Sequence, residues 1–372
     1  MDMNLVINAI KAEMKPSMGC TEPVALALAV SRTCEHLDAP TQKLEMLISS
    51  NIFKNAYSVQ IPNAGTYGIE LACVLGMLLS KPGNTMEICA GIKPEHVEKA
   101  KKLVAEGFVH VKVLKSSQFY IECTATDGKD TVHTITEDEH DNLVFCEKNG
   151  EVLLDKRVKK EAVESEEKEG TFDVTKHTFS EFYNWANEVD VADLQFIKEA
   201  IDINMEIAKK GMEKKYAFGV GPTVQNLLEK GMLKADVVTA VRSIPAAAAD
   251  FRMSGGNGSV MTFCGSGNQG ISTTLPMAVF ADKMNIPEEK LLRAEFMGML
   301  MIMYMKKYVG RLSPVCGAML AGTGSAAGMV YMMGGTAAQV KRRSTEYDGL
   351  CCRHLLRWRK GRLCGEGCSL RE

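Results

Sequence analysis

Two cysteines stand at points where the chain turns into a helix, a position that suits a reactive or metal-binding thiol. Cys20 lies in Gly19-Cys20-Thr21-Glu22-Pro23, directly before a long Ala/Leu run, and Cys316 follows Leu312-Ser313-Pro314-Val315 and precedes a run rich in Ala and Gly. Both patterns predict a helix start, and a helix N-terminus favours thiolate over thiol. Two such cysteines are compatible with a shared soft-metal site.

A glycine-rich segment from Ser254 to Gly270 surrounds a third cysteine, Cys264. Glycines let a ligand approach the backbone closely, and successive N–H groups can bind an anion. We expect a helix to begin near Thr273, so that its N-terminus also favours a carboxylate or phosphate. The spacing fits neither a Walker loop nor a dinucleotide fingerprint, and a flexible surface loop is the alternative. The candidate substrate-binding residues of this segment are Ser266, Gly267, Asn268 and Gln269.

Further polar residues could contact a substrate. Arg242 and Arg252 precede the glycine-rich segment, and a guanidinium can grip a carboxylate with two hydrogen bonds. A structural pair with Asp250 is the alternative. Ser50 and Asn51 follow a predicted strand and are candidate substrate contacts, with a polar turn as the alternative. The histidine spacings give little support for a zinc site, and the absence of a Gly-x-Ser-x-Gly elbow argues against a serine hydrolase.

Composition excludes several classes of protein. The net charge of −2 gives no electrostatic case for binding nucleic acid or an anionic membrane. No stretch reaches the roughly 18 apolar residues of a membrane span, and Met1 to Met14 lacks the pattern of a signal peptide. We therefore expect a cytoplasmic protein whose twelve cysteines form no structural disulfides.

The periodicity predicts an α+β fold. Helices are expected from about Pro23 to His36 and through most of the chain after Thr175, and short strands between Val109 and Leu154, with hairpin signals at Asp127-Gly128 and Asn149-Gly150. We predict a mostly helical catalytic domain of residues 1–42 and 175–340, an inserted smaller α/β domain of residues 43–174, and a basic tail of residues 341–372. Its apolar helices are compatible with a homo-oligomer.

Motifs at 19–23, 265–270 and 312–316 resemble, in order, those of the serine dehydratase-like alpha subunit family that includes L-cysteine desulfidase. The resemblance covers about residues 5 to 340. It implies an oxygen-sensitive [4Fe–4S] enzyme that converts L-cysteine and water to pyruvate, ammonia and hydrogen sulfide. Cys20 matches the first thiolate ligand and Cys316 the second, and an iron with an open position would act as a Lewis acid. A nearby base takes the α-proton of the amino-acid substrate; Lys54 is our candidate. L-Serine dehydratase and an inactive small-molecule-binding homologue are the alternatives.

The tail departs from the family. The resemblance implies a third ligand in a segment reading roughly Gly-Met-Ile-Cys-Asp-Gly-Ala-Lys, after the helix that ends near Gly335. This chain instead continues with Lys341-Arg342-Arg343 and carries four further cysteines, at 351, 352, 364 and 368. Taken at face value, such a tail indicates nucleic-acid binding or a small zinc knot.

A frameshift explains more of the tail. Codons can be chosen for Arg353 to Leu370 whose shifted reading is GICCDGAKDACAVKVAAC, and the single codon of Trp358 forces the Gly after Asp. The missing ligand would then fall at Leu356. We hypothesise that a frameshift near Gln339 to Arg343 replaced the original C-terminus and ended the chain early, which would leave the cluster poorly held.

Overall fold

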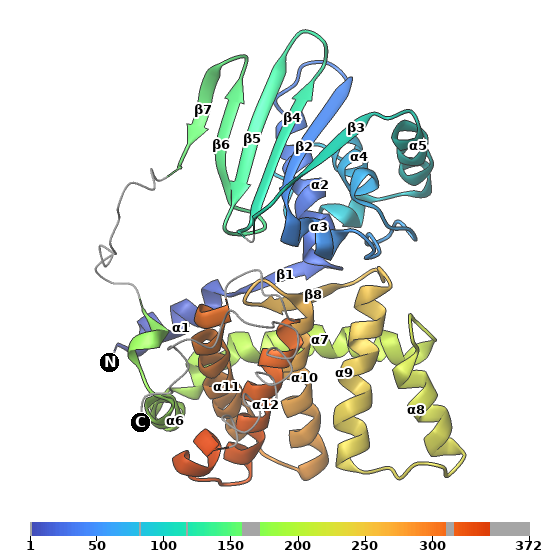
Figure 1. The fold of residues 1–372 in the computed structure, drawn as a ribbon. Coiled ribbons are helices and arrows are strands. Elements are labelled where there is room, and N and C mark those ends of the chain that lie inside the picture. Colours follow the sequence, from blue (N-terminus) through green and yellow to red (C-terminus); the bar gives the residue numbers. More distant parts are fainter. Residues whose placement is uncertain (1, 82, 117, 158–171, 310–315, 343–372) are drawn as a thin grey trace.

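The computed structural model describes residues 2–81, 83–116, 118–157, 172–309 and 316–342. These residues form two lobes, one above the other in Figure 1. We call residues 20–157 the sheet lobe, and residues 2–19 with 172–342 the helical lobe. The predicted α+β fold class is confirmed.

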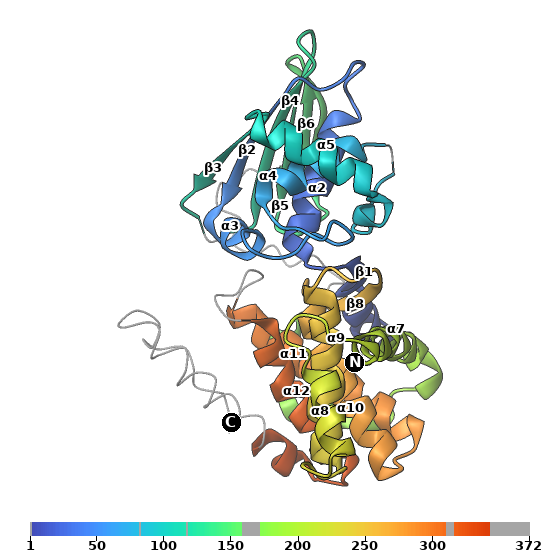
Figure 2. The same cartoon turned by 90° about the vertical axis from the view of Figure 1, so that its right-hand side faces the viewer.

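The sheet lobe is a mixed sheet with helices on one face, as Figure 2 shows for α2, α4 and α5. The strand order is β3-β2-β4-β5-β6-β7, with β2 and β3 parallel and the other neighbours antiparallel. The predicted hairpin turns join β4 to β5 and β6 to β7. The strands are β2 (Lys43–Ser49), β3 (Val109–Leu114), β4 (Tyr120–Thr126), β5 (Thr131–Glu137), β6 (Leu143–Lys148) and β7 (Glu151–Asp155). The helices are α2 (Thr21–Cys34), α3 (Ser50–Ala56), α4 (Ile69–Leu78), η1 (Ile88–Gly91) and α5 (Pro94–Ala105).

Helix α2 packs in the sheet lobe, whereas the sequence prediction assigned it to the helical domain. It is buried nearly all round, and its side chains share a core with β2, β4 and α4. Helix α4 approaches so closely that a Cβ on Gly76 would lie 2.1 Å from the carbonyl oxygen of Ala27. A helix that is apolar on every side must be enclosed, and here the sheet and α4 together enclose it.

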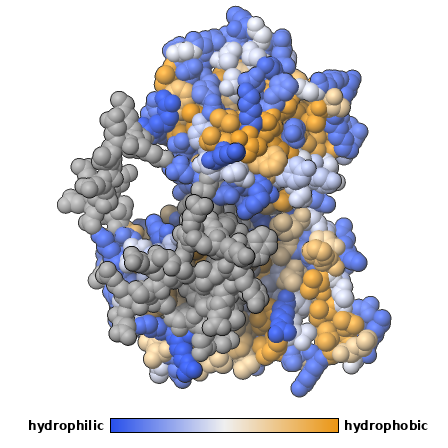
Figure 3. Space-filling view, in the orientation of Figure 1, coloured by the Kyte–Doolittle hydropathy of each residue, from blue (hydrophilic) through white to orange (hydrophobic). Residues whose placement is uncertain are grey.

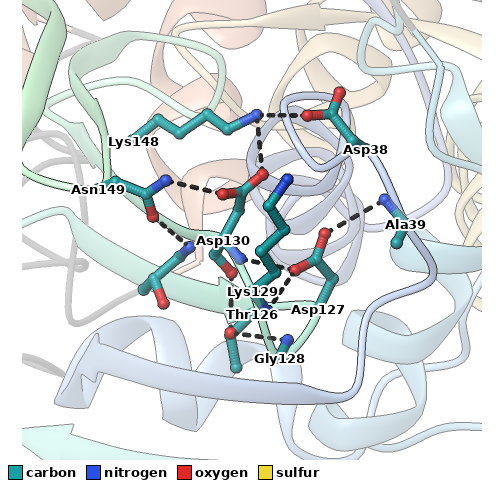
Figure 4. Close-up of polar contacts among 10 residues, drawn as sticks. Asp38, Ala39, Thr126, Asp127, Gly128, Lys129, Asp130, Lys148 and Asn149 are labelled. Carbon is teal, nitrogen blue, oxygen red and sulfur yellow. Dashed lines mark hydrogen bonds and ion pairs between the residues drawn. The ribbon is translucent and has the colours of Figure 1, made fainter.

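A polar cluster at the far end of the sheet lobe fixes its connections (Figure 4). Asp127 accepts hydrogen bonds from two backbone N–H groups of its own turn and one from Ala39. Asp130 accepts from Asn149 and pairs with Lys148 at 3.3 Å. These bonds join both hairpins and the α2–β2 connection, which explains how the register of the sheet is held.

The helical lobe is built around a methionine-rich core on α11 and α12. None of the helices in the described ranges is long and apolar enough to span a membrane. Exposed apolar side chains, including Phe218 and Met232, flank α8, and orange patches cover this side of the lobe in Figure 3. The elements are α1 (Met3–Ala12), η2 (Val174–Lys176), α6 (Phe179–Glu188), η3 (Val191–Leu194), α7 (Gln195–Glu213), α8 (Val220–Glu229), α9 (Val237–Met253), α10 (Gly267–Met284), α11 (Glu288–Val309) and α12 (Gly317–Met332).

The lobes meet along a two-stranded ribbon that the sequence did not predict. Strand β1 (Met14–Met18) pairs antiparallel with β8 (Ser259–Phe263), which runs through the segment expected to be a glycine-rich turn. Lys15 on β1 pairs with Glu139 at 2.9 Å and Asp141 at 3.1 Å, both in the β5–β6 turn of the sheet lobe. The ribbon leads from β1 into α2 and from β8 into α10, so it sets where both helices begin.

Candidate functional site

Helices α2, α10 and α12 are capped by residues that the sequence marked for chemistry. Cys20 caps α2, Ser266 caps α10 and Cys316 caps α12. The hydroxyl of Ser266 accepts a hydrogen bond from the backbone N–H of Gln269 at 3.3 Å, so α10 begins earlier than the predicted Thr273. The thiols of the two cysteines make no such capping bond in the described structure. Both thiols are therefore free for another role.

Contacts between these helix starts bring them to one place. The hydroxyl of Thr21, beside Cys20, lies 3.5 Å from the carbonyl oxygen of Gly265. On the other side of α10, Gln269 packs against the first residue of α12, where a Cβ on Gly317 would lie 2.3 Å from its Oε1. The starts of α2 and α12 therefore both contact the start of α10, and each carries a cysteine. Their helix dipoles add a partial positive charge that favours an anion.

Arg252, in the last turn of α9, lies between these helix starts and is 4% exposed. Its Nη1 donates to Oδ1 of Asn268 at 2.9 Å. Its Nε is buried without a hydrogen-bond partner, and no carboxylate in the described part of the chain pairs with it. Asp250, the structural partner that the sequence allowed, instead accepts from the backbone N–H of Val220 at 2.8 Å. A buried, unpaired guanidinium is costly unless an anionic ligand binds it.

Gly267 leaves the space in which Arg252 lies. A Cβ at this position would be 2.2 Å from Nε of the arginine. The glycine therefore keeps the guanidinium against the first turn of α10, next to the backbone N–H groups that a carboxylate ligand would also use.

Gln269 is a second buried polar group without a partner. Its side chain is fully buried, and neither Nε2 nor Oε1 makes a hydrogen bond to any described residue. Buried amides are nearly always satisfied, and an unsatisfied one costs about 1–3 kcal/mol. Together with the bare Nε of Arg252, this amide indicates that a polar ligand belongs here.

Cys20 is held by a network centred on Glu22. Its Sγ donates to Oε2 of Glu22 at 3.2 Å, and the hydroxyl of Thr21 donates to the same oxygen at 3.1 Å. Oε1 accepts from Asn55 on α3 at 3.0 Å and lies 3.9 Å from Nε2 of His140 in the β5–β6 turn. The sheet lobe thus supplies most of the groups around this thiol.

This network changes the expected state of the thiol. Burial and the adjacent Glu22 carboxylate raise the pKa of Cys20 to about 12, and Arg252 offsets this only in part. Burial also opposes ionisation of Glu22, but His140, Asn55 and Cys20 outweigh it and hold the pKa of this carboxyl well below its usual range. The expectation that the helix dipole would favour a thiolate is therefore wrong for the ligand-free protein, because desolvation dominates.

The other candidate residues lie further out. Lys54 and Ser50 are exposed on α3, where Ser50 donates to the carbonyl of Ser116, and Asn51 is half-buried at the start of the same helix. Asn55 is the α3 side chain that reaches Glu22. Arg242 is exposed on α9, ten residues before Arg252, which is about 15 Å along a helix.

Neither the sequence motifs nor the spacing pointed to His140. It follows two acidic residues in a hairpin turn, and only the packing of β5 and β6 over α2 carries it to Glu22. Its ring packs edge-on against Phe119 with centroids 4.8 Å apart.

The donor set for a metal is partial in the described ranges. Cys20 and Cys316 are soft donors at helix starts that meet, which fits a thiolate-bound metal. Cys264 instead lies in the core of the helical lobe, with its N–H bonded to the carbonyl of Glu13. No group of three His, Cys, Asp or Glu side chains that could hold a metal ion is found among the described residues. Leu356, where the frameshift hypothesis puts the third ligand, lies outside them.

Known proteins place the chain in a family. Residues 83–345 match the serine dehydratase alpha chain family. A UPF0597 protein of Porphyromonas gingivalis is 36% identical over 90% of this chain and 78% of its own length. A UPF0597 protein of Clostridium perfringens is 32% identical over 94% of this chain and 82% of its own length. No solved structure matches. The chain belongs to the serine dehydratase alpha chain family.

Proposed function

We propose that the chain is an iron–sulfur-dependent lyase that removes the β-substituent of L-cysteine, giving pyruvate, ammonia and hydrogen sulfide. The family implies a deaminating lyase and is generally associated with iron–sulfur enzymes. The observation that carries the proposal is the unpaired, buried Arg252 beside the start of α10, where the helices capped by Cys20 and Cys316 also begin.

Cys20 and Cys316 would hold two of the cluster's irons, and the third thiolate would come from the segment that the frameshift hypothesis restores. When bound, the cluster would supply a Lewis-acidic iron with an open position. The free-protein pKa of Cys20 means that its proton must leave when the thiolate binds metal. The neighbouring Glu22 oxygen lies within hydrogen-bond distance of that sulfur.

The chain's own groups would bind and orient the amino acid. Its carboxylate would pair with Arg252 and with backbone N–H groups in the first turn of α10, both of which favour an anion. Such fixing places the Cα–H bond in one direction, so that a single base can reach it.

The reaction breaks two bonds of the substrate. A base takes the α-proton, the electron pair forms the Cα–Cβ double bond, and the Cβ–S bond breaks with loss of HS⁻. The aminoacrylate tautomerises to an imine, and water hydrolyses the imine to pyruvate and ammonia. We keep Lys54 as the candidate base, since it lies on α3 next to Asn55. A small-molecule amino acid is thus the proposed partner, with neither nucleic acid nor a membrane involved. A cytoplasmic site and a homo-oligomer also remain predictions.

L-Serine is the alternative substrate, since the same steps with HO⁻ as leaving group give pyruvate and ammonia. An inactive homologue that binds a small molecule is the other alternative. It would be stabilised by an amino acid without iron and would release no pyruvate.

The test is product formation by anaerobically reconstituted protein. Two chains are compared, the chain as written and one that carries the shifted reading from residue 353 onward. We expect the second to release pyruvate and sulfide in equal amounts from L-cysteine, faster than pyruvate from L-serine, and the first to release little. Cys20→Ala in the active chain should abolish turnover, whereas Cys34→Ala, at a buried thiol on the far end of α2, should not. Pyruvate formation that survives Cys20→Ala would overturn the proposal.

A further inference from the structure

We propose that Gln269 determines specificity for an α-amino acid head group: its Oε1 accepts a hydrogen bond from the substrate ammonium and its Nε2 donates to the substrate carboxylate beside Arg252. The inference rests on the proposed function, because it assigns the part of that site which distinguishes an amino acid from other carboxylates.

The burial of Gln269 carries the first step. The side chain is fully buried in the first turn of α10, yet both polar atoms of its carboxamide lack partners among the described residues. A glutamine that served only packing could be replaced by an apolar residue without leaving two polar atoms unsatisfied. A ligand that provides one donor and one acceptor would satisfy both atoms.

The position of the amide carries the second step. Gln269 follows Asn268, which binds Arg252, and it packs against Gly317, the residue after Cys316. It therefore lies between the proposed carboxylate anchor and one of the proposed thiolates. Gly317 is needed there, since a Cβ would lie 2.3 Å from Oε1 and displace the amide.

The chemistry of the ligand carries the third step. An α-amino acid has a donor, the ammonium, on the carbon that bears its acceptor, the carboxylate. A primary carboxamide offers the complementary acceptor and donor. Arg252 can supply charge for any carboxylate, but only donors, so it cannot distinguish an amino acid from the corresponding plain acid. Oε1 of Gln269 can, because a ligand without the ammonium leaves it unpaired.

The experiment measures binding and needs no turnover. L-Alanine and propionate differ only in the ammonium group, and neither has a leaving group on Cβ. Dissociation constants are obtained from ligand-induced shifts in melting temperature of the full chain, for the parent, Gln269→Met and Gln225→Met. Gln225 is exposed on α8 and bonded to Glu229, so its variant makes the same chemical change away from the site.

We expect the parent to bind L-alanine about tenfold to a hundredfold more tightly than propionate, as for one hydrogen bond to a charged group. Gln269→Met should lose this preference, and Gln225→Met should keep it. A Gln269→Met protein that is folded and keeps the preference overturns the assignment while leaving the proposed function intact. A folded parent that binds neither compound contradicts the carboxylate site itself, and with it the proposed function.

Gln269→Glu tests the same assignment with almost no change of shape. It keeps an acceptor for the ammonium but replaces the donor that faces the carboxylate. L-Alanine should bind at least about tenfold more weakly, while ethylamine, which has no carboxylate, should bind more tightly than to the parent. Unchanged binding of both compounds would overturn the inference.

Discussion

Replacing Glu295 by glutamine should make the protein more stable at neutral pH and remove a loss of stability that the parent suffers as pH rises. Glu295 is on α11, is fully buried, and neither carboxyl oxygen has a hydrogen-bond partner among the described residues. Burial raises its pKa well above the usual value. The native protein therefore holds this group as the neutral acid, whereas the unfolded chain ionises it at a pKa near 4.3.

The sign follows from proton binding. Between the unfolded and the folded pKa the native state binds more protons than the unfolded state, so the free energy of unfolding falls as pH rises. The slope is about 1.4 kcal/mol per pH unit, which amounts to about 3 kcal/mol between pH 4.3 and pH 6.5. Below pH 4 the acid is neutral in both states and costs nothing through ionisation. Glutamine has no such dependence.

The assay is urea unfolding followed by circular dichroism at pH 5, 6 and 7. Glu289→Gln is the control, since Glu289 is on the same helix but its side chain is 62% exposed. The difference between Glu295→Gln and the parent should grow by about 1.4 kcal/mol per pH unit, while the control should show little growth. A constant difference across this range would refute the reasoning, because it would mean that the carboxyl group ionises in the folded protein at its ordinary pKa.

Three further predictions test other parts of the structure. Gly76→Ala should lower the free energy of unfolding by about 1–3 kcal/mol, because its Cβ would lie 2.1 Å from a backbone oxygen that cannot move freely; an unchanged urea midpoint would contradict the α2–α4 contact. Arg252→Met should weaken L-alanine binding by about tenfold or more without lowering the melting temperature of the ligand-free protein, since it removes an unpaired buried charge; equal affinity in both proteins would exclude Arg252 as the anchor. Lys54→Met should lower kcat by about a hundredfold or more with KM little changed; a loss below threefold would rule it out as the base.

Local sequence patterns predicted the elements whose signals are contained within a few turns. The helices expected from Glu288 to Lys307 and from Ala318 to Met333 occur as α11 and α12 within two residues, and both hairpins occur at their Asp-Gly and Asn-Gly turns. Caps and turns act through nearby backbone groups, so the sequence carries this information directly.

Features that depend on distant partners were missed. Strand β1 includes Pro16 and pairs with β8 across more than 200 residues, so neither segment shows an alternating pattern strong enough to identify it. Likewise, the unpaired state of Arg252 depends on Asp250 bonding elsewhere, which no pattern reveals. The sequence could nominate Cys20 and Cys316, but their meeting depends on the packing of α10 against both helix starts.

Iron content tests the central claim most directly, since that claim is that Cys20 and Cys316 are ligands in one cluster site of an amino-acid lyase. The chain carrying the shifted reading should bind about four irons after anaerobic reconstitution, and its Cys20→Ala and Cys316→Ala variants should each lose most of that iron. The chain as written should hold little. About four irons in the chain as written would contradict the tail hypothesis, and four irons retained in both cysteine variants would contradict the site.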